Sequence, residues 1–450
     1  MKKMKVMILL SLLVAFSPSY PTLACDIGVV SASASATGRP FIWKNRDYGL
    51  SAREEINYKN AGKNHIGASL RVLGETYDHL NIKIVSGGVN DKGFAIANAT
   101  VVEEPLREMA NINHVLLEIA LEKCETLTDF EALLAKWFNY YLYVISGNFA
   151  VIDAHGGAAI YEVWSNGSNS LTWKKYDANE AENGFVVRAN SHLTEGWVIR
   201  DGGVAIRYER AHALFTELAK NGALTPRNVL QIVGKDVAGD CDKFAEACEA
   251  CNKYDKDYAE GNPDPTDFNT DKALSRNSTT SSYVIDGAAT VSDIPLITLY
   301  CVLGEPSFSP AAPYFLSAEK IPYYAKAGSI DIFGIVYDLG IGCFMNKASF
   351  SVQSNNKLYA NNGVAMEWID QTINYERLLE VQSWVFPLED FMFDKTEAFL
   401  DYLRVHPEKI TPDTLYQFSY HCGRYIYKNY FKESLDYYPW DYTPPWEESL

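Results

Sequence analysis

The chain has 450 residues, of which 47% are hydrophobic and 22% are charged, so it is long and apolar enough to bury a large core. Its formal net charge is −17 at pH 7, which opposes binding to nucleic acid and to anionic bilayers. The sequence contains no cluster of basic residues that would indicate a nucleic-acid-binding surface. We therefore predict that nucleic acid is not a partner.

The first 24 residues have the composition of a secretory signal peptide. Lysines form a basic start, and the apolar run at 6–16 is too short to span a bilayer. Thr22 and Ala24 supply small residues at the −3 and −1 positions of a cleavage site. We predict that residues 1–24 are removed, that Cys25 becomes the first residue, and that the protein is exported to the periplasm or the extracellular space. No transmembrane segment is expected in the mature chain.

An N-terminal cysteine carries a thiol and a free α-amine on the same residue. An α-amine titrates at about 7.7–8.0 and a thiol at about 8.5, so Cys25 would combine a nucleophile with a base suited to neutral pH. Two other interpretations stay open at this point. Leu23-Ala24-Cys25 fits part of the lipoprotein pattern, in which the cysteine is lipidated, although Thr22 stands where leucine is usual. Cys25 could also be an ordinary disulfide cysteine.

The segment after Cys25 predicts a β-hairpin. Residues 26–36 are small and weakly alternating, residues 37–40 form a turn signal, and a second strand begins at Phe41. An antiparallel pair would return the polar end of the second strand, residues 44–47, to a place beside Cys25.

Three charged residues at this strand end are candidate site residues. We expect Asp47 to accept a hydrogen bond from the α-amine, and Lys44 or Arg46 to favour the thiolate of Cys25 by proximity. A solvated strand end without a catalytic role is the alternative interpretation.

The order of a cysteine, a small-residue strand, a turn and a basic-Asn-x-Asp motif resembles the opening of the N-terminal-nucleophile (Ntn) hydrolases. It is most similar to the linear-amide group, which contains choloylglycine hydrolases, penicillin V acylase, acid ceramidase and acyltransferase-type peptidases. Choloylglycine hydrolases have Arg-Asn-x-Asp here, so Asp47 matches and Lys44 replaces the arginine. The replacement keeps a cation but loses the planar guanidinium fork.

Three later segments extend the resemblance. A turn at 90–93 separates two predicted strands, and the resemblance implies an oxyanion-hole role for Asn98 in the second strand. A strand from Gly184 is predicted to end on Asn190, which matches the second active-site asparagine of the family. Arg276, ahead of another strand, is the best positional candidate for a late active-site arginine.

Two histidines are candidates for a catalytic base or a metal ligand. A hairpin is predicted over 148–162, and we interpret His155 as a residue of its turn. A cysteine–histidine pair has no fixed spacing, so His192 stays open as an alternative base for Cys25.

We predict no cofactor and no metal. His155 has no partner at ligand spacing, and the cluster Cys241, Cys248 and Cys251 lacks the second pair that zinc sites usually have, so a local disulfide is favoured. The acidic loop at 252–272 lacks the spacing of a Ca²⁺ loop.

The C-terminal part has a different composition from the rest. Helical spacing covers 364–385, 388–405 and 414–431, with Pro387 and Pro412 as expected stops or starts. The resemblance to the Ntn hydrolases implies an α+β fold, a four-layer αββα sandwich of two antiparallel sheets, which we place over 25–349. A helical, aromatic-rich extension is predicted over 350–450. Packing of these aromatics on the main domain is favoured over a sugar- or lipid-binding surface.

Together these features predict an exported cysteine Ntn amidohydrolase that cleaves a linear, non-peptide amide of a small molecule through an acyl-enzyme on Cys25. The candidate catalytic residues are Cys25, Lys44, Asp47, Asn98, Asn190 and Arg276. Acyl transfer to another amine and homo-oligomerisation stay open. The alternatives are a dipeptidase of the same superfamily and a lipid-anchored, non-catalytic surface protein acylated at Cys25.

Overall fold

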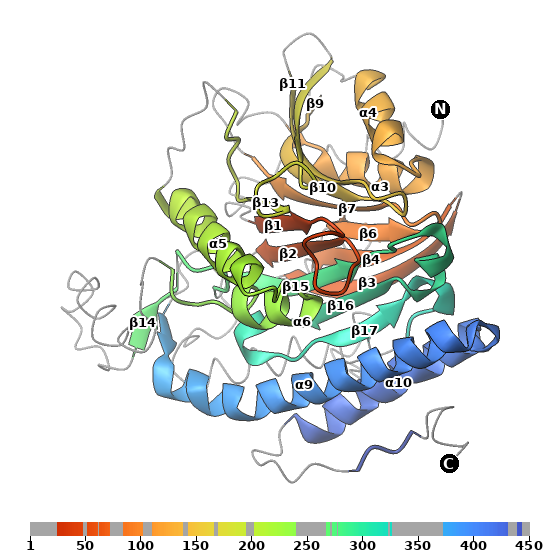
Figure 1. Ribbon diagram of the computed structural model, residues 1–450. Helices are drawn as coiled ribbons and strands as arrows, with labels where there is room; N and C mark the ends of the chain where they lie inside the picture. Colours follow the sequence, from red (N-terminus) through yellow and green to blue (C-terminus); the bar gives the residue numbers. More distant parts are fainter. Residues whose placement is uncertain are drawn as a thin grey trace, which may run out of the picture.

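The computed structural model describes residues 25–47, 52–61, 63–72, 84–101, 110–137, 143–165, 170–194, 202–239, 267–270, 272–276, 278–322, 325, 372–430 and 439–442. Within them, two large antiparallel sheets pack together and carry helices on their outer faces (Figure 1). The predicted αββα sandwich is confirmed. The predicted signal peptide, the cysteines at 241–251 and most of the acidic loop lie outside these residues.

The first sheet contains the N-terminal strand in its interior. Its order is β13-β1-β2-β15-β16-β17, and every neighbouring pair is antiparallel. The six strands are β1 Cys25–Val30, β2 Phe41–Asp47, β13 Phe185–Arg188, β15 Thr279–Asp286, β16 Thr298–Leu303 and β17 Ala312–Phe315. All residues of β1 and β2 are buried, as expected for strands that are covered on both faces.

The second sheet has the order β12-β11-β10-β7-β6-β4-β3, with β5 paired to β4. Its strands are β3 Ala52–Ala61, β4 Lys63–Val72, β5 Ile84–Val85, β6 Gly87–Asn90, β7 Ala95–Thr100, β10 Ser146–Ile152, β11 Ala158–Ser165 and β12 Leu171–Asp177. Two small sheets pair β8 (Ala110–Asn111) with β9 (Tyr143–Val144) and β14 (Asp267–Asn269) with β18 (Thr372–Asn374).

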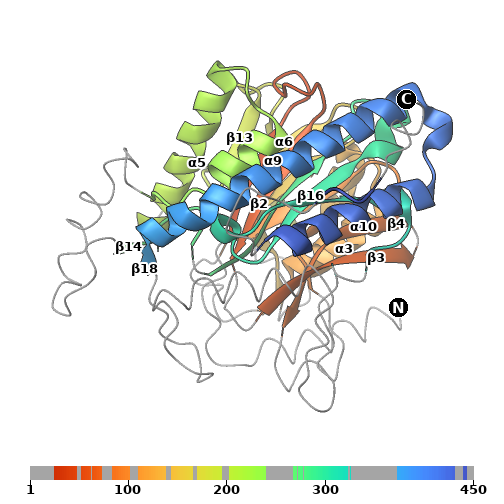
Figure 2. The same cartoon turned by 90° about the horizontal axis from the view of Figure 1, so that it is seen from below.

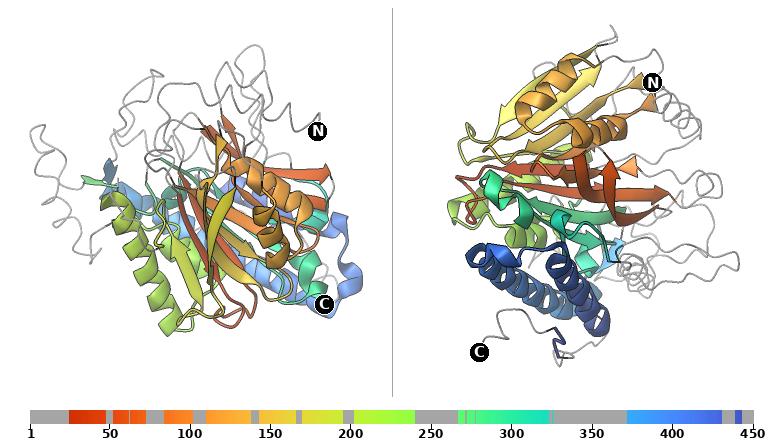
Figure 3. Two further views of the ribbon diagram at one scale, coloured as in Figure 1. Left: turned by 90° about the horizontal axis from the view of Figure 1, so that it is seen from above. Right: turned by 90° about the vertical axis from the view of Figure 1, so that its right-hand side faces the viewer.

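Helices complete the outer layers. The α-helices within the described ranges are α3 Asn113–Lys123, α4 Leu127–Ala135, α5 Gly202–Lys220, α6 Pro226–Asn228, α9 Tyr375–Val405 and α10 Pro412–Asn429. One π-helical turn, η2 (Val229–Val233), follows α6, and the 3₁₀ turns are η6 Val291–Leu296, η7 Pro306–Phe308, η8 Leu316–Ala318 and η10 Pro407–Lys409. Helices α9 and α10 lie side by side (Figure 2), at the opposite end of the molecule from α3 and α4 (Figure 3).

Three apolar clusters hold the layers together. One lies between the two sheets, where β7 contributes the small residues Ala95, Ala97 and Ala99 opposite Cys25 and Ile27, and it continues into α9 and α10. A second joins α3 and α4 to the second sheet. A third joins α5 and η2 to the outer face of the first sheet. Burial of these apolar surfaces is the main stabilising contribution to the sandwich.

The C-terminal helices differ from their predicted bounds. The expected break at Pro387 is wrong, because α9 continues from Tyr375 to Val405 through this proline. Pro387 removes one backbone hydrogen bond, but the neighbours Val385 and Leu388 are fully buried, and we infer that their packing outweighs that loss. The strand β18 also occupies part of the predicted helix 364–385. Helix α10 begins at Pro412 as expected, with Thr411 as its N-cap.

The aromatic residues of this part pack inward, as the favoured interpretation expected. Phe399 stacks on Phe418 with ring centroids 4.0 Å apart, and Phe315 of β17 meets Phe399 at 6.0 Å. Trp440 packs against Phe391 at 5.7 Å. The two helices therefore share the core of the first sheet.

The first strand is shorter than predicted. It ends at Val30, and residues 31–36 form turns in which the amides of Ala34 and Ser35 donate to the carbonyl of Ser31. The Ser31 hydroxyl bonds that of Ser33. Serine side chains that bond nearby groups compete with a strand ladder, which the alternating small-residue pattern does not reveal. None of the helices in the described part of the chain has the length and hydropathy to cross a membrane.

Candidate active site

Cys25 begins β1 and is buried. The antiparallel register pairs it with Arg46 of β2, so the predicted hairpin brings the charged strand end beside the cysteine. Arg46 Nη1 lies 3.4 Å from Cys25 Sγ. Of the two cations expected near the thiol, Arg46 is the one that contacts it.

The backbone nitrogen of Cys25 is held by Asn190. Cys25 N donates to Asn190 Oδ1 at 2.9 Å, and Asn190 Nδ2 donates to the Thr100 carbonyl at 2.7 Å. Asn190 lies two residues beyond the end of β13 at Arg188 rather than on the strand. The structure therefore places Asn190 against the backbone nitrogen of Cys25, the atom that the predicted cleavage would turn into an α-amine.

The β10–β11 hairpin holds the loop that carries Asn190. Asn148 and Glu162 face each other across this hairpin. Asn148 Nδ2 donates to the carbonyls of Ala189 and Ser191 at 2.7 and 3.0 Å. The side chain of Asn148 in the predicted hairpin thus holds the backbone on both sides of Asn190.

Glu162 fixes the far end of the same loop. Its carboxylate accepts from the amides of Leu193 and Thr194 at 2.9 and 3.0 Å, and from Arg188 Nε at 2.7 Å. Burial opposes the charge, but Arg188 and the hydrogen bonds from the loop outweigh it and lower the pKa of Glu162.

Neither histidine contacts the cysteine among the described residues. His155 lies exposed in the β10–β11 turn, as predicted. His192 is buried, with Nε2 3.4 Å from the Gly147 carbonyl and its ring 5.5 Å from that of Trp164, and burial lowers its pKa. The hydrogen bonds of Cys25 in this part of the structure go to Arg46 and Asn190, so the geometry does not support His192 as a base.

Asp47 is bound by side chains from other elements. Arg276 donates to Asp47 Oδ2 through Nη2 at 2.6 Å and through Nε at 2.9 Å, and Thr279 Oγ1 donates to Oδ1 at 2.5 Å. The single N–H of Cys25 in the uncleaved chain donates to Asn190, so the hydrogen bond expected from a free α-amine to Asp47 stays a prediction. The prediction that Arg276 belongs to the site is consistent with its pairing to Asp47.

Lys44 holds Asn98. Lys44 Nζ donates to Asn98 Oδ1 at 3.0 Å and to the Ser86 carbonyl at 2.8 Å. Since the amide oxygen of Asn98 faces a cation, its Nδ2 remains as a donor directed elsewhere. Lys44 and Arg46 are two residues apart on β2, so their side chains leave the same face of the strand.

A glycine makes room for this arrangement. Tyr283 Oη also donates to the Ser86 carbonyl, at 3.0 Å. A Cβ at Gly87 would lie 2.1 Å from Tyr283 Oη and 3.0 Å from the Ile96 carbonyl. Any side chain at Gly87 would therefore displace the support under Lys44 and Asn98.

Arg207 is the residue that the sequence analysis missed. It lies on α5, with its side chain 2% exposed, and Nη2 donates to Asn190 Oδ1 at 2.9 Å. Its Nη1 lies 3.8 Å from Asp26 Oδ2 and 3.7 Å from Asp47 Oδ2. The available signal was a charge on the apolar stripe of an amphipathic helix, since the buried residues of α5 are Val204, Arg207, Ala211, Leu214, Phe215 and Leu218.

Asp26 is a buried carboxyl in the same cluster. Burial raises its pKa to about 6, against the attraction of Arg207, and the nearby charge of Asp47 raises it further. The cluster thus joins Cys25, Asp47, Asn190 and Arg276, whereas Lys44 and Asn98 form a second group connected to it through β2. Among the described residues, no group of histidine, cysteine and carboxylate side chains could hold a metal ion.

A buried carboxyl behind Arg276 makes stability depend on pH. Ser275 Oγ donates to Glu305 Oε1 at 2.6 Å, and burial raises the pKa of Glu305 to about 7 despite this bond. A folded-state pKa above the unfolded value means that stability is greatest below about 4.5 and is lost as the pH rises through about 7.

We therefore expect Glu305→Gln, which keeps an acceptor for Ser275, to gain stability relative to the wild type as the pH rises from 5 to 8. The expected gain in unfolding free energy is about 2.5 kcal/mol, measured by urea denaturation at both pH values. If the difference in unfolding free energy between the two proteins stayed constant from pH 5 to pH 8, Glu305 would not titrate in this range.

Comparisons with known proteins find similar structures but no matching family. No protein-family model matches the chain, and no curated protein matches it. Two variants of the conjugated bile acid hydrolase from Clostridium perfringens are similar at 12% and 11% identity, with TM-scores of 0.32 and 0.33, each over 62% of this chain and 89% of the other. The Caenorhabditis elegans ortholog of N-acylethanolamine-hydrolyzing acid amidase is similar at 12% identity and a TM-score of 0.31, over 58% of this chain and 92% of that one.

Since the identities and TM-scores are low, we infer the function of this chain from the contacts of its own residues.

Proposed function

We propose that this protein is an exported cysteine Ntn amidohydrolase that cleaves a linear, non-peptide amide. The observation that carries the proposal is the environment of Cys25: its nitrogen is 2.9 Å from Asn190 Oδ1 and its sulfur is 3.4 Å from Arg46 Nη1. One residue thus has an oriented nitrogen and a sulfur beside a cation, which is what a nucleophile with its own base requires.

The proposed reaction begins when residues 1–24 are removed and the α-amine of Cys25 is free. The amine takes the thiol proton, Sγ attacks the amide carbonyl, and the amine returns the proton to the leaving nitrogen. Water then attacks the thioester, which releases the acid and regenerates Cys25. Arg46 stabilises the thiolate, and Asp47 with Arg276 fixes the end of β2 that carries Arg46.

Asn98 is the proposed oxyanion donor. Lys44 occupies its amide oxygen, so Nδ2 can donate to the negative oxygen that forms on the substrate carbonyl. Such a donor needs no reorganisation when the oxyanion forms, because its orientation is already set.

We expect Asn98→Ala to lower kcat by about 10²–10³-fold with little change in KM, because the contact strengthens only as the oxyanion forms. Steady-state kinetics on the best amide substrate measure both constants. Asn179→Ala, which changes an exposed asparagine in a turn after β12, is the control and should match the wild type. If Asn98→Ala raised KM alone, Asn98 would be a binding contact.

The proposal is tested with the mature protein and a panel of N-acyl amides that differ in acyl chain and amine, with amine release as the readout. Hydrolysis that is lost in Cys25→Ala supports the proposal, and absence of hydrolysis across the panel contradicts it. Dipeptides in the same panel test the dipeptidase alternative. Intact mass of the mature N-terminus separates a free Cys25 from a lipidated one.

A further inference from the structure

Arg207 is a buried cation at the place where β1, the end of β2 and the Asn190 loop meet. Its Nη2 is 2.9 Å from Asn190 Oδ1, and the same oxygen accepts from Cys25 N at 2.9 Å. Its other terminal nitrogen lies 3.8 Å from Asp26 and 3.7 Å from Asp47. One guanidinium from α5 therefore contacts Asn190, which holds the Cys25 nitrogen, and also lies beside the carboxylates of Asp26 and Asp47.

Because Arg207 and the Cys25 nitrogen share one acceptor oxygen, the protonation state of the α-amine is restricted. A neutral amine can donate one hydrogen to Asn190 Oδ1 and keep its lone pair for the thiol proton. A protonated amine would place a second cation on the oxygen that Arg207 already occupies, and like charges at this separation repel.

Other charged groups face this site from each packed element. They are Asp26 on β1, Arg46 and Asp47 on β2, His114 on α3, Arg207 on α5 and Arg276 before β15. The two aspartates favour a protonated amine, and the three arginines oppose it. Burial and the charge of Arg46 lower the pKa of His114 to about 4, so His114 is neutral at pH 7.

We propose that Arg207 is a positioning residue that orients the Cys25 nitrogen through Asn190 and keeps the α-amine unprotonated at neutral pH. The guanidinium is suited to both tasks, because its planar fork reaches Asn190 and the two aspartates at once and it stays charged at all relevant pH values. This inference rests on the proposed function, since it concerns the base of the same reaction.

The test compares pH profiles of kcat/KM for the mature wild type and two variants of Arg207. Arg207→Gln keeps an amide donor for Asn190 but removes the charge, so the acid limb should move up by about one pH unit. Arg207→Lys keeps the charge but loses the fork. Its acid limb should stay in place, while kcat falls by roughly tenfold because Asn190 is held less firmly.

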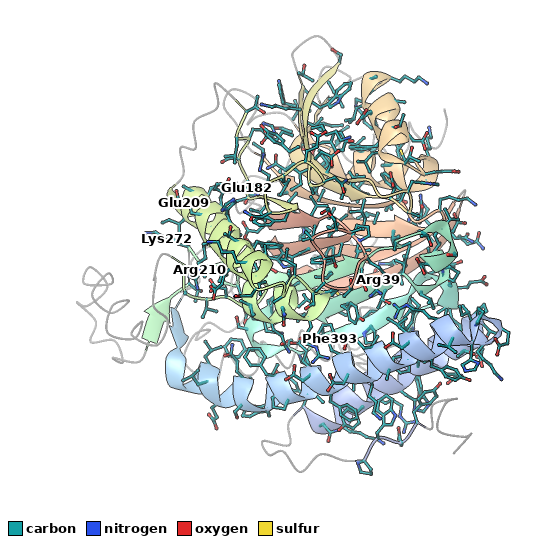
Figure 4. All side chains as sticks on the ribbon, viewed as in Figure 1. Arg39, Glu182, Glu209, Arg210, Lys272 and Phe393 are labelled. Atoms are coloured by element: carbon teal, nitrogen blue, oxygen red, sulfur yellow. The ribbon has the colours of Figure 1, made fainter. Side chains whose placement is uncertain are left out.

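Arg210 provides the matched control on the same helix (Figure 4). It pairs with Asp236 at 2.7 Å, so Arg210→Gln also breaks an ion pair of α5 but leaves the contacts of Asn190 intact. Its acid limb should equal that of the wild type. An unmoved limb in Arg207→Gln, or an equal movement in Arg210→Gln, would overturn the inference.

Two further measurements keep the inference separate from the proposed function. If the wild type hydrolyses no amide, the proposed function fails, and the ¹³Cα resonance of labelled Cys25 still reports the titration of its amine. That titration must then move to higher pH in Arg207→Gln for the inference to survive. If Arg207→Gln does not fold, as judged by circular dichroism, Arg207→Lys decides: a wild-type kcat would overturn the positioning role.

Discussion

Replacement of Cys25 by serine is expected to reduce amide hydrolysis by about 10³-fold or more, close to the background of buffer. The serine hydroxyl is a far poorer nucleophile than a thiolate, and Arg46, 3.4 Å from the sulfur, cannot make a hydroxyl ionise near neutral pH. The measurement is amine release from the best substrate of the panel.

The fold of Cys25→Ser should be unchanged, because the side chain keeps its size and the backbone contact with Asn190 does not involve the sulfur. Circular dichroism and the unfolding midpoint provide this control. Wild-type hydrolysis by the serine variant would refute the proposed mechanism, whatever the behaviour of the neighbouring residues.

A chain that retains a methionine before Cys25 is expected to bind substrate but to hydrolyse it poorly. The peptide nitrogen of Cys25 still donates to Asn190, so the site stays assembled, but an amide nitrogen has no basic lone pair to accept the thiol proton. Aminopeptidase treatment that exposes Cys25 should restore the rate. The two states are compared by amine release before and after trimming, with the N-terminus verified by intact mass.

Trimming of the Cys25→Ser variant is the control for nonspecific effects of the protease. Equal activity of the wild-type chain before and after trimming would show that a side chain is the base. His192 would be the first to test, although its described contacts are with Gly147 and Trp164.

The two-sheet sandwich was predicted from the resemblance to the Ntn hydrolases, whereas local signals predicted only its individual hairpins. The turn residues at 37–40 and 90–93 fix which strands pair, and the register then brings Arg46 opposite Cys25. The motif Lys44 to Asp47 was found for the same reason, since its distance from Cys25 is set by one hairpin.

The contacts that tie the site together were not predictable in this way. Asn190 was placed in the site only by the family resemblance, because it is 165 residues from Cys25 in the sequence. Arg207 contacts Asn190 from a helix on the outer face of the sheet, and no local pattern predicts that contact. Arg276 and Thr279 donate to the two oxygens of Asp47, and these contacts come from residues far from the hairpin that no local signal connects to it. Pro387 was interpreted as a break by its local effect, and buried neighbours in α9 outweigh it.

The packed rings of Phe315, Phe399 and Phe418 give the C-terminal helices an influence on the proposed activity that needs no contact with substrate. They belong to the same apolar cluster as Cys25, so α9 and α10 stabilise the sheet on which the nucleophile lies. A substitution that opens a cavity at Phe399 would destabilise the fold, so that a larger fraction of the molecules would be unfolded at any time. Cellular chaperones and proteases would then remove these unfolded molecules. Loss of activity after a change in this region would then reflect fewer enzyme molecules, each with an intact active site.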